Sequence, residues 1–195
     1  MARWEPDSRG RLERAALALF GERGFENTTV AEIAARAGLT ERTFFRYFAD
    51  KREVLFGGAG ALRELLVRTV DAAPATAEPL DVIVAAFEAA ATMLQERRAF
   101  SLQRHVVIAA NAELGEREVI KLSLISAALA DALRRRGVAG SAASLTADTG
   151  IAIFRAAFQT WVDVAEQREL PQLIRDTFEE LRAVAAGAEM RGARV

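Results

Sequence analysis

Basic side chains crowd one short stretch of the sequence, between residues 36 and 52. It holds five basic and two acidic residues: Arg36, Arg42, Arg46, Lys51 and Arg52, with Glu41 and Asp50. The stretch therefore carries an excess of +3, although the formal net charge of the 195-residue chain is −1 at pH 7. Contact with nucleic-acid phosphates needs positive charge only where the phosphates lie. The stretch is a candidate phosphate-binding surface.

Elsewhere the sequence has few residues that could act in catalysis or bind a metal. The chain has no cysteine, so it can form no disulfide, cysteine zinc site or thiol nucleophile. His105 is its one histidine and cannot build a multi-histidine metal centre alone. No phosphate loop, dinucleotide-binding glycine pattern or Ser–His–acid grouping occurs. We expect a protein that is not an enzyme and that needs no metal or cofactor.

Helices are the elements that must position the basic stretch. Apolar residues recur three and four positions apart, as in Leu12, Ala16, Leu19 and Phe20, and no run alternates as a strand would. Caps, glycines and prolines predict about nine helices: 8–23, 30–37, 41–48, 51–70, 80–98, 99–111, 114–136, 141–168 and 171–186. The helices lengthen along the chain. The predicted fold is therefore all-α, with a three-helix domain at 8–52 and a larger helical domain at 53–187.

The segment 29–51 has the pattern of a helix-turn-helix. Thr29 and Glu32 are spaced as a capping box, and Thr40 is a suitable N-cap for the following helix. Gly38 falls where the turn needs a positive φ. Small and apolar residues lie at spacings that place them between the two helices: Ile33, Ala34, Leu39 and Phe44. Such a motif inserts its second helix into the DNA major groove.

Residues 11–55 resemble the DNA-binding domain of the tetracycline-repressor (TetR-type) family. The similarity runs through AALALFGERGFENTTVAEIAARAGLTERTFFRYFADKREVL. It includes the Gly24-Phe25 turn, the Thr28-Thr29-Val30 start, the Ala37-Gly38-Leu39 turn and the Tyr47-Phe48-x-x-Lys51 ending. The resemblance implies a bacterial regulator that binds double-stranded DNA.

The same resemblance implies DNA contacts at particular positions: Thr29, Thr40, Glu41, Arg42, Thr43, Phe45, Arg46, Tyr47 and Lys51. Thr29 would offer its N–H and hydroxyl to a phosphate. Arg42 would bond a guanine through two hydrogen bonds, and the methyl of Thr43 would touch a thymine methyl. Tyr47 and Lys51 would hold the DNA backbone irrespective of sequence.

Three aromatic residues and one arginine near these positions allow more than one interpretation. Phe45 replaces a tyrosine that is common in the family, so its hydroxyl bond to phosphate is lost. Phe44 and Phe48 fit the protein core better than a DNA contact. Arg46 fits a phosphate contact and a solvated helix face equally well.

The long helices of the second half are apolar over much of their circumference, which indicates either a buried core or the lining of a pocket. The family commonly encloses a small-molecule pocket in this domain. The candidate ligand-binding residues are Phe87, Met93, Arg104, His105, Arg155, Phe158, Gln159 and Trp161. A buried Arg155 would need an internal carboxylate or an anionic ligand as its partner. Arg104 and His105 would border the pocket mouth or lie on an exposed face.

The end of the sequence, FRAAFQTWVDVAEQRELPQLIRDTFEELRA, is similar to one branch of the family. That branch is associated with acyl-CoA-like ligands, as in regulators of the mycofactocin system. An apolar stripe on the last helix would form the interface of a homodimer or pack within its own chain: Leu170, Leu173, Ile174, Phe178 and Leu181. The dimer would match a palindromic operator.

Together these features predict a ligand-responsive transcriptional regulator. The expected protein is a cytoplasmic repressor, without a signal peptide or membrane span, that binds its operator as a dimer and is released by a small hydrophobic or acyl-type effector. The alternatives are a helical small-molecule carrier and a transcriptional activator of the same fold. Gly57, Gly58 and Gly60 predict a soft point early in the helix 51–70.

Overall fold

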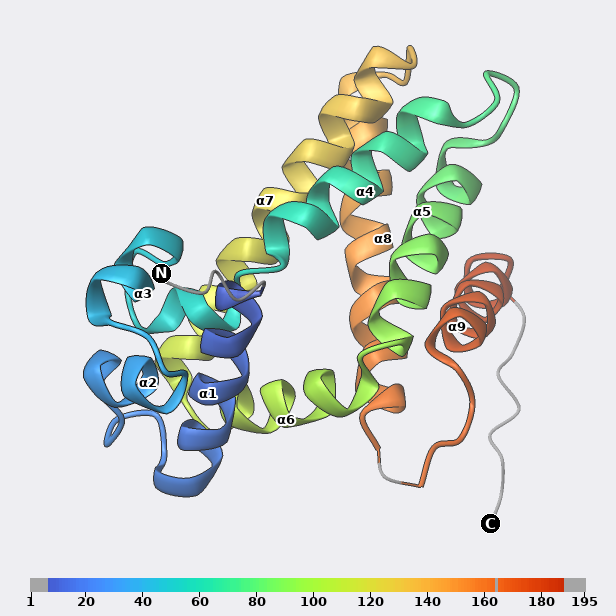
Figure 1. The fold of residues 1–195 in the computed structure, drawn as a ribbon. Coiled ribbons are helices and arrows are strands. Elements are labelled where there is room, and N and C mark those ends of the chain that lie inside the picture. Colours follow the sequence, from blue (N-terminus) through green and yellow to red (C-terminus); the bar gives the residue numbers. More distant parts are fainter. Residues whose placement is uncertain (1–6, 164, 188–195) are drawn as a thin grey trace. The chain divides into compact units, whose positions relative to one another are not determined.

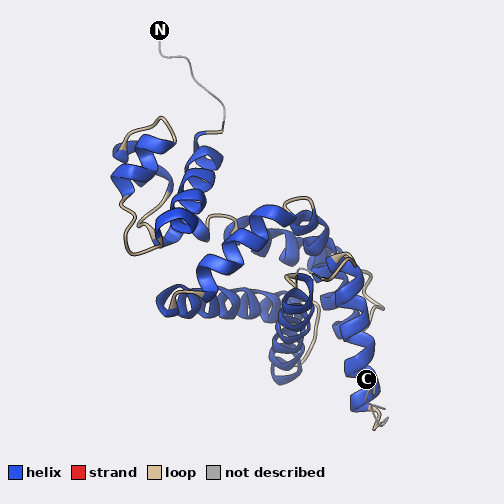
Figure 2. Cartoon of the chain, turned by 90° about the horizontal axis from the view of Figure 1, so that it is seen from below, coloured by secondary structure: helices blue, strands red, loops and turns tan. Residues whose placement is uncertain are grey.

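The computed structural model describes residues 7–163 and 165–187, and every regular element within them is a helix (Figures 1 and 2). The α-helices are α1 (Ser8–Arg23), α2 (Val30–Arg36), α3 (Glu41–Tyr47), α4 (Ala59–Ala72), α5 (Pro79–Gln95), α6 (Arg98–Ala109), α7 (Ala112–Arg135), α8 (Gly140–Trp161) and α9 (Leu170–Ala185). One 3-10 helix, η1, covers Arg52–Leu55. The predicted all-α fold is confirmed.

Two of the expected helices are not continuous over their predicted ranges. The helix predicted at 51–70 is divided into η1 and α4, with a turn after Phe56. At this turn the carbonyl of Gly57 accepts a hydrogen bond from Arg9, and a Cβ on Gly57 would lie 2.8 Å from Glu13 Oε1. The glycine therefore allows a close approach to α1, and the predicted soft point is a break between two helices.

The helix predicted at 141–168 stops at Trp161. In the following segment the Glu166 carboxylate accepts hydrogen bonds from the backbone N–H groups of Gln167 and Arg168. The hydrogen bond from the Arg168 side chain, followed by these backbone bonds, lowers the pKa of Glu166 to about 2. A local polar turn thus replaces the last helical turns.

The chain divides into two compact units, each containing segments from two parts of the sequence. Of the described residues, the first unit contains 7–60 together with 99–121, and the second contains 61–98, 122–163 and 165–187. Helix α6 and the first half of α7 thus group with α1, α2 and α3. The sequence divided the chain at a single point, between residues 52 and 53, and did not foresee this grouping.

The first unit has its own apolar core. Its largest fully buried side chains include Leu12 of α1, Ile33 of α2 and Phe44 of α3. Val107 and Ile108 of α6 and Leu114 of α7 belong to the same cluster. The end of α6 and the start of α7, here called the α6–α7 elbow (residues 107–114), therefore complete the core that the short N-terminal helices share.

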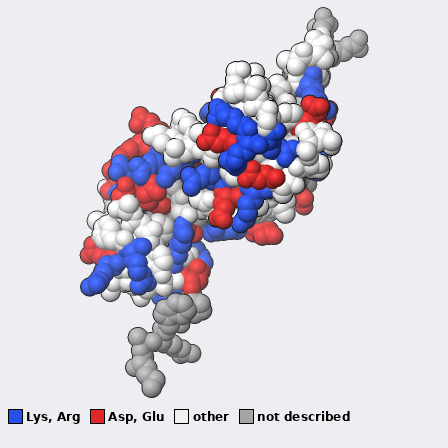
Figure 3. Space-filling view, turned by 90° about the horizontal axis from the view of Figure 1, so that it is seen from above, with Lys and Arg blue, Asp and Glu red and all other residues white. Residues whose placement is uncertain are grey.

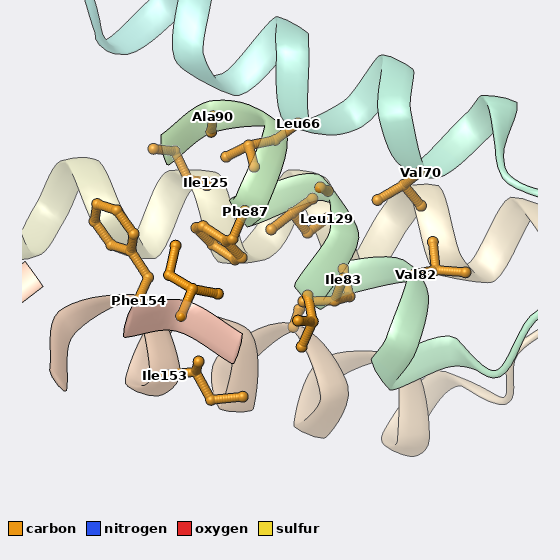
Figure 4. Close-up of a cluster of buried hydrophobic side chains, with 14 of the residues drawn as sticks. Leu66, Val70, Val82, Ile83, Phe87, Ala90, Ile125, Leu129, Ile153 and Phe154 are labelled. Atoms are coloured by element: carbon orange, nitrogen blue, oxygen red, sulfur yellow. The ribbon is translucent and has the colours of Figure 1, made fainter. Parts of the chain in front are cut away.

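The core of the second unit lies where α4, α5, α7, α8 and α9 meet (Figure 4). Phe87 of α5 stacks on Phe154 of α8, with ring centroids 5.3 Å apart. Between them Gly150 lets the helices approach, since a Cβ there would lie 2.2 Å from Ile83 Cγ2. Trp161 is fully buried at the end of α8, and its indole N–H donates to Gln95 Oε1 at 2.9 Å.

Charged side chains of both signs are interspersed over the face shown in Figure 3. Among the described residues, no group of three or more His, Cys, Asp or Glu side chains is placed to hold a metal ion. In the same part of the chain, no helix combines the length and apolar character needed to cross a membrane.

Candidate DNA-binding surface

Side-chain caps define the helix-turn-helix at its two N-termini. Thr29 Oγ1 accepts a hydrogen bond from the Glu32 N–H at 3.2 Å, and Glu32 Oε2 accepts from the Thr29 N–H at 2.8 Å. The predicted capping box is thereby confirmed. These bonds, with the Thr29 N–H as the largest cause, hold the pKa of Glu32 below its ordinary value. Because Glu32 engages both the N–H and the hydroxyl of Thr29, a phosphate at Thr29 would compete with an internal partner.

The turn between α2 and α3 depends on Gly38 for two reasons. Its φ is +65°, the left-handed region that favours glycine, as the sequence predicted. Arg11 of α1 also reaches into the turn and donates to the carbonyl of Ala37, and a Cβ on Gly38 would lie 2.7 Å from Arg11 Nη2. The second reason could not be read from the motif, because Arg11 is 26 residues from Ala37.

Helix α3 is anchored by its inner face. Thr40 caps it by accepting from the Thr43 N–H at 3.2 Å. Phe44 is fully buried and Phe48 is 3% exposed, with their rings 5.3 Å apart. The core interpretation of these two phenylalanines is confirmed. Since the inner face is fixed by packing, the outer face of the helix has a defined direction.

The outer face of α3 carries most of the predicted recognition residues. Glu41, Arg42, Phe45, Arg46 and Tyr47 are all exposed. Phe45 is 55% and Tyr47 39% exposed, and they are the two aromatic residues among the large exposed apolar side chains of the described chain. Thr43 is half-buried, and its hydroxyl lies 3.1 Å from that of Thr40.

The five cations of the basic stretch differ in how far they are neutralised. Arg36 pairs with Glu22 of α1 at 2.6 Å, and Arg52 pairs with Glu113 of α7 as well as Asp50. Within residues 7–163 and 165–187, Arg42 and Arg46 have no carboxylate partner. Sequence counting therefore overstated the free positive charge, because Glu22 and Glu113 lie outside the stretch.

Lys51 is tied to the turn that precedes α2. Its ammonium donates to the carbonyl of Phe25 at 2.7 Å and lies 4.1 Å from the centre of the Phe25 ring. The side chain is half-buried. An ammonium has three N–H groups, so a phosphate bond is compatible with this contact. In this structure, however, Lys51 links the segment after α3 to Phe25 in the turn after α1.

A further ion-pair network connects η1 with α7, and sequence reasoning missed it. Glu53 accepts hydrogen bonds from Arg117 and from Lys121, the latter at 3.0 Å. Burial raises the pKa of Glu53, but these two cations outweigh it and hold the pKa below its ordinary value. Arg104 of α6 donates to the carbonyl of Leu55 at 2.7 Å and pairs with Glu118 at 2.9 Å. The residues of these contacts are 14 to 68 positions apart and left no signal in the sequence.

The eight candidate ligand-binding residues are divided between the two units. Arg104 and His105 belong to the first unit, and the other six belong to the second. Phe87 and Trp161 are buried in the packed core, while Met93 and Phe158 are half-buried. Arg155 and Gln159 are exposed on α8. The expectation of a buried Arg155 is therefore wrong: its neighbours Phe154 and Ile153 turn inward, and the arginine turns to solvent.

The five residues of the expected dimer stripe are used inside the chain. Leu170 and Ile174 are fully buried, Leu173 is 3% and Phe178 6% exposed, and Leu181 packs against the same core. This corrects the interface expected from the stripe, because α5 and α8 already cover these side chains. A second protomer would have to meet other residues.

Comparison with known proteins identifies the helix-turn-helix. Residues 13–56 match the family described as bacterial regulatory proteins, tetR family. The HTH-type transcriptional regulator TcmR of Streptomyces glaucescens is 40% identical over 82 residues, covering 42% of this chain and 36% of that protein. The HTH-type transcriptional repressor KstR2 of Mycobacterium tuberculosis is 38% identical over 86 residues, covering 42% and 43%. The chain thus matches about two fifths of the length of these relatives.

A solved structure extends the likeness to the whole fold. FadR of Thermus thermophilus, a TetR-family transcriptional repressor crystallised with lauroyl-CoA, has a TM-score of 0.57 and 25% sequence identity to this chain. The match covers 96% of this chain and 98% of that one. The helix-turn-helix of this chain is thus similar to the tetR family of bacterial regulatory proteins, and the fold of the chain is similar to that of one of its solved members.

Proposed function

We propose that the chain is a DNA-binding transcriptional repressor that acts as a homodimer on a palindromic operator and is released by a small hydrophobic or acyl-type effector. The observation that carries the proposal is the outer face of α3. Arg42, Phe45 and Arg46 are exposed there on a helix whose inner face is locked by Phe44. A large exposed aromatic side chain is unfavourable in water, and beside arginines that have no carboxylate partner in the described part of the chain it suits contact with a DNA groove.

Within this function Arg42 reads bases, while Tyr47 and Lys51 contact the DNA backbone. Arg42 is exposed at the start of α3, where recognition helices present side chains to base edges. Loss of a two-bond contact with guanine costs about 1–3 kcal/mol of discrimination. Arg42→Ala should therefore weaken binding to the operator by about tenfold or more and leave binding to scrambled DNA nearly unchanged. Equal loss on both DNAs would contradict base reading by Arg42.

The homodimer is proposed through the solvent-facing side of α8. Leu145, Ala152, Ala156 and Gln159 follow one another three to seven residues apart on this exposed side. Leu145 is 70% exposed, which is unfavourable for a leucine in water. Small side chains beside it would let a second helix approach closely. Light scattering at micromolar concentration should give twice the chain mass, and Leu145→Glu should shift it towards the monomer.

The effector proposal draws on the apolar second unit and on the lauroyl-CoA complex of Thermus thermophilus FadR. Of the candidate ligand residues, Phe158 is best placed to respond, since it packs against the core and is only half-buried; Met93 is half-buried as well. Selection of operators from random DNA, repeated with and without lauroyl-CoA, tests both halves of the function. Failure to enrich any DNA would refute DNA binding, and enrichment that lauroyl-CoA leaves unchanged would refute an acyl-CoA effector. A carrier would bind the acyl compound without enriching DNA.

A further inference from the structure

Two neighbouring side chains on the outer face of α3 form an unusual surface pair. Arg46 Nη2 donates to the hydroxyl of Tyr47 at 3.1 Å, and the guanidinium carbon lies 4.9 Å from the centre of the Tyr47 ring. Consecutive residues on a helix ordinarily point about 100° apart. The arginine must therefore fold over the ring of its neighbour, so that both polar ends lie together.

The direction of the hydrogen bond determines what the pair can still do. The Tyr47 oxygen accepts, so its own proton remains available to another acceptor. Arg46 has used one of five N–H groups, and its planar fork can still bond two oxygens of one phosphate. A cation beside the phenol oxygen makes the phenol a stronger hydrogen-bond donor. The pair thus presents donors from two side chains at one place.

Among the described residues, Arg46 shares with Arg42 the lack of a carboxylate partner, whereas the other three cations of the basic stretch are engaged by the protein. Arg36 and Arg52 are neutralised by Glu22 and Glu113 respectively, and Lys51 is directed to the carbonyl of Phe25. No carboxylate in the described part of the chain pairs with Arg46. A phosphate approaching α3 therefore meets a free positive charge at this pair.

We propose that Arg46 and Tyr47 act as one unit that binds a single DNA phosphate, with Arg46 holding the tyrosine hydroxyl in position. The proposal rests on the DNA-binding function and deepens it by assigning the backbone contact of α3 to a coupled pair. Arg46 supplies the charge and the orientation, and Tyr47 supplies an additional donor. The contact is independent of DNA sequence, because every phosphate offers the same oxygens.

A double-mutant cycle tests the coupling. The dissociation constants of the full-length wild type, Arg46→Ala, Tyr47→Phe and the double variant are measured on the operator selected by the wild type and on scrambled DNA. We expect Tyr47→Phe to bind about tenfold more weakly on both DNAs, and Arg46→Ala to bind more weakly than Tyr47→Phe because it also loses the contact of the guanidinium itself. The double variant should bind as weakly as Arg46→Ala, because Tyr47 contributes only when Arg46 orients it. A double variant that binds about tenfold more weakly than Arg46→Ala would show two independent contacts and overturn the pair.

The salt dependence of DNA affinity provides a second measurement, and a loss of folding would not produce the same result. Between about 50 and 200 mM salt, Arg46→Ala should lower the slope of log affinity against log salt by about 0.9, the value for one phosphate contact. Tyr47→Phe should leave the slope unchanged. Arg46→Lys should keep the slope but remove the effect of Tyr47→Phe, because an ammonium lacks the planar group that stacks on the ring. An unchanged slope for Arg46→Ala would refute the phosphate contact.

Arg68→Ala is the matched control, because Arg68 is an exposed arginine of α4 that pairs with Glu64. It should bind both DNAs as the wild type does. Helical circular dichroism and the melting temperature establish that each variant is folded. If the wild type enriches no operator at all, DNA binding itself fails. If it enriches one and the cycle is additive, DNA binding stands and the coupled pair alone is refuted.

Discussion

The two units differ in how the free backbone groups at the ends of their helices are hydrogen-bonded. In the first unit α1, α2 and α3 are capped by Asp7, Thr29 and Thr40, each through a backbone N–H three residues ahead. In the second unit the N-cap residues of α5, α8 and α9 form no such side-chain bond. The difference shows that the two units draw their stability from different sources.

Long-range contacts replace local caps in the second unit. Arg136 donates to the carbonyls of Val70 and Ala73 at the end of α4, 66 and 63 residues away. Arg98 donates to the carbonyl of Trp161 at 3.2 Å and to that of Glu166 at 2.9 Å. Helices of seven residues such as α2 and α3 cannot form alone and need every local bond. Helices of 16 to 24 residues can rely on an apolar face.

The largest effect is expected from removing the central side chain of the second unit. Trp161→Ala should lower the free energy of unfolding by about 3–5 kcal/mol, because it opens a cavity and removes the hydrogen bond from the indole to Gln95. Urea titration followed by circular dichroism measures the loss. Thr160→Ala on the same helix is the control, since an exposed side chain should change stability by less than about 0.5 kcal/mol. Similar losses in both variants would mean that burial does not dominate this unit.

The helix-turn-helix should be most sensitive at its turn. Gly38→Ala should cost about 1–2 kcal/mol through the positive φ alone, with a further loss from the clash with Arg11. The same change at Gly21 of α1 meets no atom within 4 Å and should stabilise the chain by about 0.5–1 kcal/mol. Thermal unfolding of the two variants compares them directly. A neutral Gly38→Ala variant would show that the turn tolerates a side chain.

Side-chain N-caps should contribute to stability in the first unit, whereas the second unit folds without them. Thr40→Ala should cost about 1 kcal/mol and reduce operator binding, while Thr40→Ser keeps the capping oxygen and should be nearly neutral. At the N-cap of α8, Ala139→Ser should add up to about 1 kcal/mol, because the backbone there is already extended and lacks a capping side chain. Chemical denaturation gives all three values. A destabilised Ala139→Ser variant would argue against the contrast between local and long-range caps.

The smallest effect is expected in acid, at the network around Glu53. Its pKa in the folded chain lies below the ordinary 4.5, so its contribution to stability is present above pH 4.5 and is lost as the pH falls through the folded pKa. Glu53→Gln should be less stable than the wild type at neutral pH, and this difference should shrink between about pH 5 and pH 3. Glu64→Gln, in the exposed pair with Arg68, should change little at any pH. A constant difference across this range would exclude the ion pairs of Glu53 as its cause.

The predictable parts of the structure are those whose partners lie within a few residues. The capping box of Thr29 and Glu32, the turn at Gly38 and the cap at Thr40 each involve neighbours three or four positions apart. Their geometry follows from the local backbone. The apolar spacing that buries Phe44 and Phe48 equally fixed which face of α3 remains outside. These are the features on which the family resemblance depends.

The features that the sequence did not predict depend on partners far away in the chain. Arg155 was expected inside because its neighbours in sequence are apolar, yet a turn of 100° per residue carries it to the exposed side of α8. The apolar stripe of α9 could serve a partner or its own chain, and only the positions of α5 and α8 decide for its own chain. For Lys51 the phosphate contact stays a prediction, but its bond to the carbonyl of Phe25, a residue 26 positions away, was not foreseen.

The sequence by itself determined the helical class, the helix-turn-helix and the direction of its outer face, because caps, glycines and apolar periodicity act over one helical turn. Only the tertiary structure decided how much of the local charge is free and which apolar faces are covered. It also placed the α6–α7 elbow with the DNA-binding helices. These outcomes depend on contacts between residues 14 to 68 positions apart. Such contacts follow from packing of whole helices, which no local pattern records.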